Sequence, residues 1–237
     1  MNLTQRHSFL ILMFVIGCGS YPAGDLANQA LESDELATVT ISDDWIHFEP
    51  ATPISDFGVI FYPGGKVEAE AYAPILKEIS RRGLDTYLLY VPRDLAILNT
   101  DAALNVMDTR TETEAWVLAG HSLGGVAAAK MTSEDTRVVG LSLWASYPSG
   151  SVDLSDSTIA VQSLVGTEDA VVNWENWETS SEQLPESTDW IQIEGGNHSQ
   201  FGDYGLQEGD GTATISPEAQ WEYTANALQE MITSQIP

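Results

Sequence analysis

Short apolar runs alternate with longer amphipathic stretches along most of the chain. The apolar runs span four to eight residues, the usual length of strands, and several are apolar at nearly every position, as in strands buried on both faces. The pattern predicts strands over residues 38–41, 45–48, 57–62, 84–91, 115–119, 138–144, 159–165 and 189–193.

Helices are predicted between these strands. Residues 68–82 carry apolar side chains on one helical face and end in two arginines and a glycine, which are signals of a helix C-terminus. Further helices are predicted over 123–134 and over 216–234, where a serine and a proline open the segment. Alternating strands and helices are typical of an α/β fold with a mostly parallel central sheet and helices on both faces. We expect one such domain over residues 38–237.

The N-terminus has the pattern of an export signal. Arg6 and His7 precede an unbroken apolar run over residues 9–16, and the small Gly17 follows. This run is far shorter than the roughly 20 residues that cross a bilayer, so a retained transmembrane helix is the weaker interpretation. We therefore expect residues 1–17 to be a signal peptide.

The end of this signal resembles the bacterial lipobox, in which cleavage occurs before a lipidated cysteine. The residues are Val15-Ile16-Gly17-Cys18, and Cys18 is the only cysteine in the chain. The pattern predicts an exported protein of the cell envelope, held to a membrane by a lipid on Cys18; the alternative is a secreted protein with an incidental cysteine. Residues 18–37 are polar and acidic without sustained periodicity, which is typical of a tether.

Acidic residues far outnumber basic ones, 35 against 9, and the formal net charge is -26. Nucleic acids are bound by clusters of Lys and Arg, which this chain lacks, so a nucleic-acid-binding function is excluded. The acidic residues are spread along the chain, which indicates a solvated acidic surface, and we expect added salt to stabilise it. A single cysteine excludes an internal disulfide and a cysteine-rich metal site.

A candidate nucleophile lies in the segment Gly120-His121-Ser122-Leu123-Gly124. This segment has the pattern G-x-S-x-G and joins a predicted strand to a helix that begins with small residues. In such a turn the serine adopts a strained conformation, and side chains two residues before or after it would collide with backbone, which explains both glycines. We expect the helix to direct its positive N-terminal end at the Ser122 oxygen.

A serine nucleophile needs a base, and elimination leaves one histidine. His7 lies in the signal, His121 is part of the turn and His47 precedes the serine. The chain order in this architecture is serine, acid, histidine, so the candidate is His198, in a glycine-rich loop after the predicted strand 189–193.

The candidate acids follow the predicted strand 159–165, because catalytic groups in parallel sheets gather beyond the carboxyl ends of the strands. Both Glu168 and Asp169 lie there. We expect Asp169 to accept the Nδ1 proton of His198 and to orient its ring, with Glu168 as the alternative.

An attacked carbonyl develops negative charge on its oxygen, which two backbone N–H groups can stabilise. We expect one from Leu123, directly after the serine. The second is expected from Gly65, in the loop after the predicted strand 57–62, with Lys66 adjacent to it.

Five sequence blocks together resemble the α/β-hydrolase superfamily, and within it the small lidless group similar to dienelactone hydrolases. The blocks, all within residues 57–221, are F-Y-P-G-G-K-V-E-A-E-A-Y at 61–72, G-H-S-L-G-G at 120–125, L-W-A-S-Y-P at 143–148, G-T-E-D at 166–169 and G-G-N-H-S-Q-F-G-D-Y-G at 195–205. The resemblance implies an α/β-hydrolase fold and acyl hydrolysis by Ser122, Asp169 and His198. Dienelactone hydrolases carry a cysteine where this chain has Ser122, so the resemblance does not extend to lactone specificity.

We therefore expect a serine hydrolase that cleaves a carboxylic ester through an acyl-enzyme, without a metal or an organic cofactor. A neutral ester is favoured, because an acidic surface would not steer anionic substrates inward. The alternatives are thioester or peptide cleavage by the same residues, and a non-catalytic envelope-anchored binding protein on the same scaffold. The order of Ser122, Asp169 and His198 favours an enzyme.

The interval between Ser122 and Asp169 is nearly filled by the predicted helix, strands and connection, which leaves no room for a large cap domain. We expect an open cleft shaped by Phe201, Tyr204 and the stretch 202–211. Trp144 and Tyr147 are expected in the core, with cleft lining as the alternative.

Overall fold

The computed structural model describes residues 19–113 and 115–235. The predicted signal peptide over residues 1–17 and the predicted lipidation site Cys18 lie outside these ranges. Within them, no helix has both the length and the apolar composition needed to cross a membrane.

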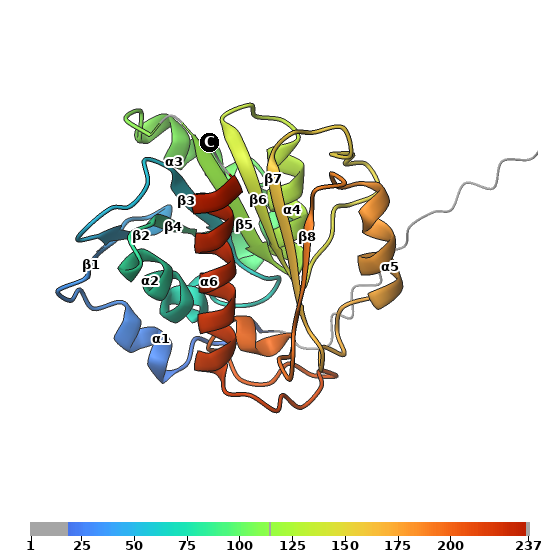
Figure 1. Ribbon diagram of the computed structural model, residues 1–237. Coiled ribbons are helices and arrows are strands. Elements are labelled where there is room, and N and C mark those ends of the chain that lie inside the picture. The colour runs from blue at the N-terminus through green and yellow to red at the C-terminus, as the bar shows by residue number, and fades with distance from the viewer. Residues whose placement is uncertain (1–18, 114, 236–237) are drawn as a thin grey trace, which may run out of the picture.

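The described residues form a central eight-stranded sheet (Figure 1) in the order β1-β2-β4-β3-β5-β6-β7-β8. The pairs β1–β2 and β2–β4 are antiparallel, and all the other pairs are parallel. The strands are β1 (Ala37–Ile41), β2 (Trp45–Pro50), β3 (Gly58–Tyr62), β4 (Asp85–Leu89), β5 (Trp116–His121), β6 (Val138–Trp144), β7 (Ala160–Gly166) and β8 (Asp189–Ile193).

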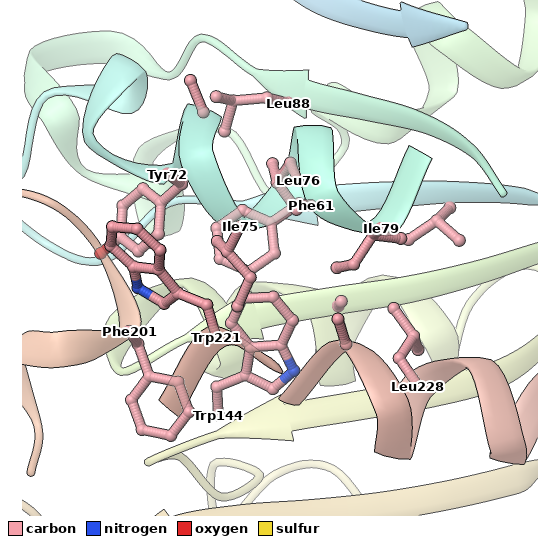
Figure 2. Packing of buried hydrophobic residues seen from close by; sticks show 14 of the residues in the cluster. Phe61, Tyr72, Ile75, Leu76, Ile79, Leu88, Trp144, Phe201, Trp221 and Leu228 are labelled. Carbon is pink, nitrogen blue, oxygen red and sulfur yellow. The ribbon is translucent and has the colours of Figure 1, made fainter. Parts of the chain in front are cut away.

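Helices cover both faces of this sheet. Alternate residues of β3 divide between two apolar cores: Phe61 packs with side chains of α2 (Ala73–Arg81) and α6 (Pro217–Gln235), whereas Ile60 packs with those of α3 (Ala102–Thr109) and α4 (Leu123–Thr132). Figure 2 shows the first core, where side chains of α2 and α6 meet Phe61 and Trp144 between the two layers. Within the described residues, each connection between consecutive strands holds at most one α-helix, and no further domain is inserted.

The predicted α/β architecture is confirmed, and each predicted strand is present with its ends within two residues of those expected. Three short helices were not predicted: α1 (Asp25–Ala30), α3 and α5 (Trp174–Thr179). They span six to eight residues, which is too short for a helical apolar period to stand out in the sequence. The predicted helix over 68–82 begins as a 3-10 turn, Ala69–Tyr72, before α2.

The prediction of a tether over residues 18–37 is wrong for the segment 20–27, which we call the N-terminal strap. Tyr21 N–H donates to the carbonyl of Lys66 at 2.6 Å, and Glu68 N–H donates to the carbonyl of Tyr21 at 3.0 Å. Farther along, Gly24 N–H donates to the carbonyl of Asp203 at 2.7 Å. The segment docks through backbone hydrogen bonds, so its polar composition did not reveal that it is ordered.

Candidate active site

Ser122 stands in a strained turn between β5 and α4. Its φ is 51° and its ψ is -121°, a conformation that non-glycine residues rarely adopt and that costs about 1–3 kcal/mol. Two hydrogen bonds hold the turn: Ser122 N–H donates to the carbonyl of Trp144 at 2.9 Å, and the Ser146 hydroxyl donates to the carbonyl of Ser122 at 2.7 Å. The backbone is therefore fixed in the shape expected of a nucleophile turn.

The two glycines that flank Ser122 are needed for close backbone packing. A Cβ at Gly120 would lie 2.5 Å from the backbone carbon of Gly124. A Cβ at Gly124 would lie 2.2 Å from the carbonyl oxygen of Tyr62 and 2.4 Å from that of Pro63. Both distances are far below ordinary contact, so the steric reason inferred from the sequence holds in the structure.

The structure brings His198 and Asp169 together although they lie on different loops. Nδ1 of His198 is 2.8 Å from Oδ2 of Asp169, and both side chains are buried, with exposures of 1% and 0%. The other carboxylate oxygen, Oδ1, accepts N–H groups of Val171 and Val172 at 2.9 and 2.8 Å. Because an ionised carboxylate only accepts hydrogen bonds, Nδ1 of His198 must carry the proton, and a neutral ring then has an accepting Nε2.

The accepting nitrogen of His198 is buried and has no hydrogen-bond partner among the described residues. Its ring lies 4.4 Å, centroid to centroid, from the ring of His121, the residue directly before Ser122. The imidazole of His198 therefore lies beside the turn that carries Ser122. No hydrogen bond joins Nε2 of His198 to the hydroxyl of Ser122 in the described residues, and such bonds commonly tighten only when substrate binds.

Glu168, the alternative acid, is exposed, and in the described residues no hydrogen bond or ion pair joins its side chain to His198. Its backbone N–H donates to the carbonyl of Gly196 at 2.8 Å, which ties the acid loop to the histidine loop. The geometry thus favours Asp169 over Glu168 as the partner of His198.

The loop that holds Gly65 lies against the first turn of α4. A Cβ at Gly65 would be 2.9 Å from Cδ2 and 3.2 Å from Cβ of Leu123. Leu123 is the first residue of α4, where backbone N–H groups have no acceptor within the helix and the helix dipole is positive. The two residues predicted to stabilise an oxyanion are therefore neighbours.

A buried hydroxyl links this loop to the turn that carries Ser122. Tyr72 accepts the N–H of Gly64 at 3.1 Å, and its oxygen is 2.8 Å from Nδ1 of His121. Burial lowers the pKa of His121 well below its usual value; the neighbouring His198 adds to the shift, and a backbone contact with His198 opposes it. Burial likewise raises the pKa of Tyr72 far above its usual value. Both groups are therefore neutral at physiological pH.

Asp210 organises the histidine loop, and no pattern in the sequence pointed to this role. Its Oδ2 accepts the N–H and the hydroxyl of Ser199 at 2.8 and 2.6 Å, and its Oδ1 accepts the N–H of Ala170 at 3.3 Å. The carboxylate therefore bridges the residues that follow His198 and Asp169.

Two aromatic residues expected to shape a cleft are instead in the core, and that prediction is wrong. Phe201 is fully buried, with its ring 5.3 Å from His121 and 5.9 Å from Trp144, and Tyr204 is buried beside Tyr72. The chain after His198 turns inward through a short 3-10 helix, Ser199–Phe201. The two aromatic side chains therefore pack behind the candidate site, in the core. Trp144 is in the core, as expected.

Tyr147 occupies an intermediate position. Its ring is half-buried against Val165, Val172 and Trp177, and its hydroxyl accepts a hydrogen bond from the side-chain amide of Asn176 at 3.2 Å. It lies beyond the carboxyl end of β6, on the same edge of the sheet as Ser122. In the described ranges, no group of three or more His, Cys, Asp and Glu side chains could hold a metal ion.

Comparisons with known proteins agree with this fold. Among curated proteins, none matches this chain. A solved structure of TT1662 from Thermus thermophilus is similar with a TM-score of 0.61 and 15% identity, covering 84% of this chain and 99% of that one. Thermogutta terrifontis esterase 2 gives a TM-score of 0.58 at 13% identity, covering 85% of this chain and 95% of that one.

A ferulic acid esterase from Streptomyces cinnamoneus is similar with a TM-score of 0.60 and 17% identity, covering 78% of this chain and 67% of that one. At these identities the likeness shows a common fold. The model described as the alpha/beta hydrolase family matches residues 58–222, well over half of the chain. The chain therefore belongs to the alpha/beta hydrolase family.

Proposed function

We propose that the protein is a serine hydrolase that cleaves a neutral carboxylic ester. The observation that carries this proposal is the buried His198–Asp169 pair, which leaves Nε2 of His198 free beside the strained turn of Ser122. Ser122 is the nucleophile, His198 the general base and Asp169 the acid that holds the imidazole in its Nδ1–H form.

The reaction proceeds in two halves. Nε2 of His198 takes the proton of the Ser122 hydroxyl as the oxygen attacks the ester carbonyl, and the resulting oxyanion is stabilised by the N–H groups of Leu123 and Gly65. The bond from carbon to the alkoxy oxygen breaks, and the leaving alcohol takes the proton from His198. Water then gives a proton to His198, attacks the acyl-enzyme and releases the acid, and Ser122 regains its proton.

Three features support an ester substrate. The family comprises hydrolases, and two of the similar solved structures are described as esterases. The acidic surface, with a net charge of -26, would repel anionic substrates. The strand connections carry no inserted cap domain in the described residues, as expected of a hydrolase that acts on small esters without a lid.

Hydrolysis of p-nitrophenyl acetate and butyrate tests this proposal, alongside a thioester and a peptide anilide with the same acyl groups. We expect release of p-nitrophenol by the wild type, a fall in kcat of about 10^4-fold or more in Ser122→Ala and His198→Ala, and slower turnover of the other two classes. Faster thioester or anilide cleavage would replace the ester assignment. Inactivity toward all three classes would favour a binding protein on this scaffold.

We also propose that the mature protein begins at a lipidated Cys18 and is anchored in the cell envelope. The support is the position of the only cysteine at the end of the signal pattern. Cells grown with a clickable palmitate analogue should incorporate label into the wild type and not into Cys18→Ser. Incorporation into neither protein, or release of the wild-type protein into the medium, would support the secreted alternative.

A further inference from the structure

Tyr72 ends the 3-10 turn before α2, and its fully buried hydroxyl contacts one backbone N–H and one side chain, from two segments that are far apart in sequence. It accepts the N–H of Gly64 at 3.1 Å and lies 2.8 Å from Nδ1 of His121. Gly64 precedes Gly65 of the proposed oxyanion loop, and His121 precedes Ser122. One hydroxyl therefore joins the two segments that would meet at the reacting carbonyl.

The directions of these hydrogen bonds follow from the groups involved. The N–H of Gly64 can only donate, so the phenol oxygen accepts from it. Among the described residues, Nδ1 of His121 is the one acceptor within hydrogen-bond distance of the phenol proton, so we assign the phenol as the donor to Nδ1 and place the ring proton on Nε2. The depressed pKa of His121 agrees with a neutral ring.

The ring of His121 also contacts the proposed base. It lies 4.4 Å from the ring of His198 and 5.3 Å from that of Phe201. A rotation of His121 would move the surface on which His198 rests, and it would leave Nδ1 without its partner. The hydrogen bond between Nδ1 and the hydroxyl of Tyr72 opposes this rotation.

Resting on the proposed function, we propose that Tyr72 is a positioning residue for ester hydrolysis. Its hydroxyl holds the oxyanion loop through Gly64 and fixes the orientation and tautomer of His121, which in turn supports His198. The oxyanion loop and His198 must be correctly placed relative to each other, because the oxyanion is stabilised at the same time as the proton is transferred. Tyr72 itself does not contact the reacting atoms.

The chain offers a matched control in Tyr62, at the end of β3. Its buried hydroxyl also makes two hydrogen bonds, to the carbonyl of Thr100 at 2.6 Å and from the N–H of Ala103 at 3.1 Å. These bonds lie in the other core, with α3. Tyr62→Phe therefore removes the same chemical group from a comparable setting away from His121 and Gly64.

The experiment compares Tyr72→Phe and Tyr62→Phe with the wild type. Urea unfolding should show a similar loss of stability in both variants. With p-nitrophenyl acetate, kcat should fall about 10- to 100-fold in Tyr72→Phe with KM within about twofold of the wild type, whereas Tyr62→Phe should keep kcat within about twofold. Equal kcat values in the two variants, or an effect on KM alone, would overturn the proposal.

A second measurement separates a failure of this inference from a failure of the proposed function. The ¹⁵N shifts of the histidine rings should report unprotonated Nδ1 in His121 of the wild type, a changed Nδ1 signal of His121 and shifted His198 signals in Tyr72→Phe, and no such change in Tyr62→Phe. A protonated Nδ1 in His121, or unaltered signals in Tyr72→Phe, would refute the link. If the wild type cleaves no ester, the proposed function fails and the positioning role with it, while the ring signals still test the hydrogen bond.

Discussion

Oδ2 of Asp169 lies 2.8 Å from Nδ1 of His198, although 28 residues separate the two in the chain. The two residues come together because β7 and β8 are parallel neighbours whose carboxyl ends lie at one edge of the sheet. The N–H groups of Val171 and Val172 hold the carboxylate from the other side. This arrangement fixes the ring so that its free nitrogen is on the side away from Asp169.

Replacement of Asp169 by Asn should abolish most activity without unfolding the protein. An amide of the same shape can donate to Nδ1 of His198, which favours the wrong tautomer, and we expect kcat to fall about 10^3- to 10^4-fold. Ester hydrolysis at pH 7 measures the effect. Glu168→Gln, an exposed neighbour, is the matched control and should retain activity; an equal loss in both variants would contradict the assignment of Asp169.

Stability should decrease in weak acid because of His121. Its pKa in the folded state is well below the usual value, through burial first and then the adjacent His198, while Tyr72 facing it stays neutral. Below pH about 6.5 the unfolded chain takes up a proton at this position that the folded chain does not. The free energy of unfolding therefore falls as pH falls, by up to about 1.4 kcal/mol per pH unit from this group.

Urea unfolding between pH 7 and pH 5 measures this contribution. His121→Gln has no titrating group at this position, so its unfolding free energy should fall less steeply than that of the wild type. The carboxylates are present in both proteins, so their contribution is common to the two profiles. Parallel pH profiles would show that folding does not lower the pKa of His121, which would contradict this prediction.

The N-terminal strap should contribute to activity as well as to stability. It pairs with Lys66 and Glu68, next to Gly65, through the backbone of Tyr21. A protein that starts at Asp25 loses these bonds, each worth about 1 kcal/mol, and we expect a lower melting temperature and a roughly tenfold lower kcat. A protein that starts at Ser20 is the control; equal kcat in the two would show that the oxyanion loop needs no such support.

Salt should raise the melting temperature. The net charge of -26 produces self-repulsion in the folded state, and raising the ionic strength from 0.1 to 1 M shortens the screening length from about 10 to about 3 Å. Differential scanning calorimetry in NaCl measures the shift. A melting temperature that stays constant or falls would mean that the acidic surface is not a net source of instability.

The strands and the nucleophile turn could be predicted from the sequence because their signals are local. A run such as Phe57–Tyr62 is apolar at most positions, and the glycines around Ser122 stand at fixed spacings. Asp169 and Glu168 could be named as candidates because both follow the end of a predicted strand in a sheet with parallel order, whereas the hydrogen bond to His198 distinguishes Asp169. These inferences need only the spacing of apolar residues along the chain and the strand order of the fold.

The supporting contacts could not be predicted because they join residues that are distant in sequence. Tyr72 and His121 are 49 positions apart, and nothing near either residue indicates their hydrogen bond. The strap docks through backbone groups, which every residue carries, so its acidic composition was misleading. Phe201 was expected at a cleft because loop aromatics often line sites, but three-dimensional packing places it beneath His121.

The most direct test of Ser122 as the nucleophile is covalent labelling of the folded protein with a fluorophosphonate probe, followed by mass spectrometry. We expect one adduct, on Ser122, which forms much more slowly in His198→Ala and is absent from Ser122→Ala. An unlabelled folded protein, or an adduct on another residue that persists in Ser122→Ala, would contradict it.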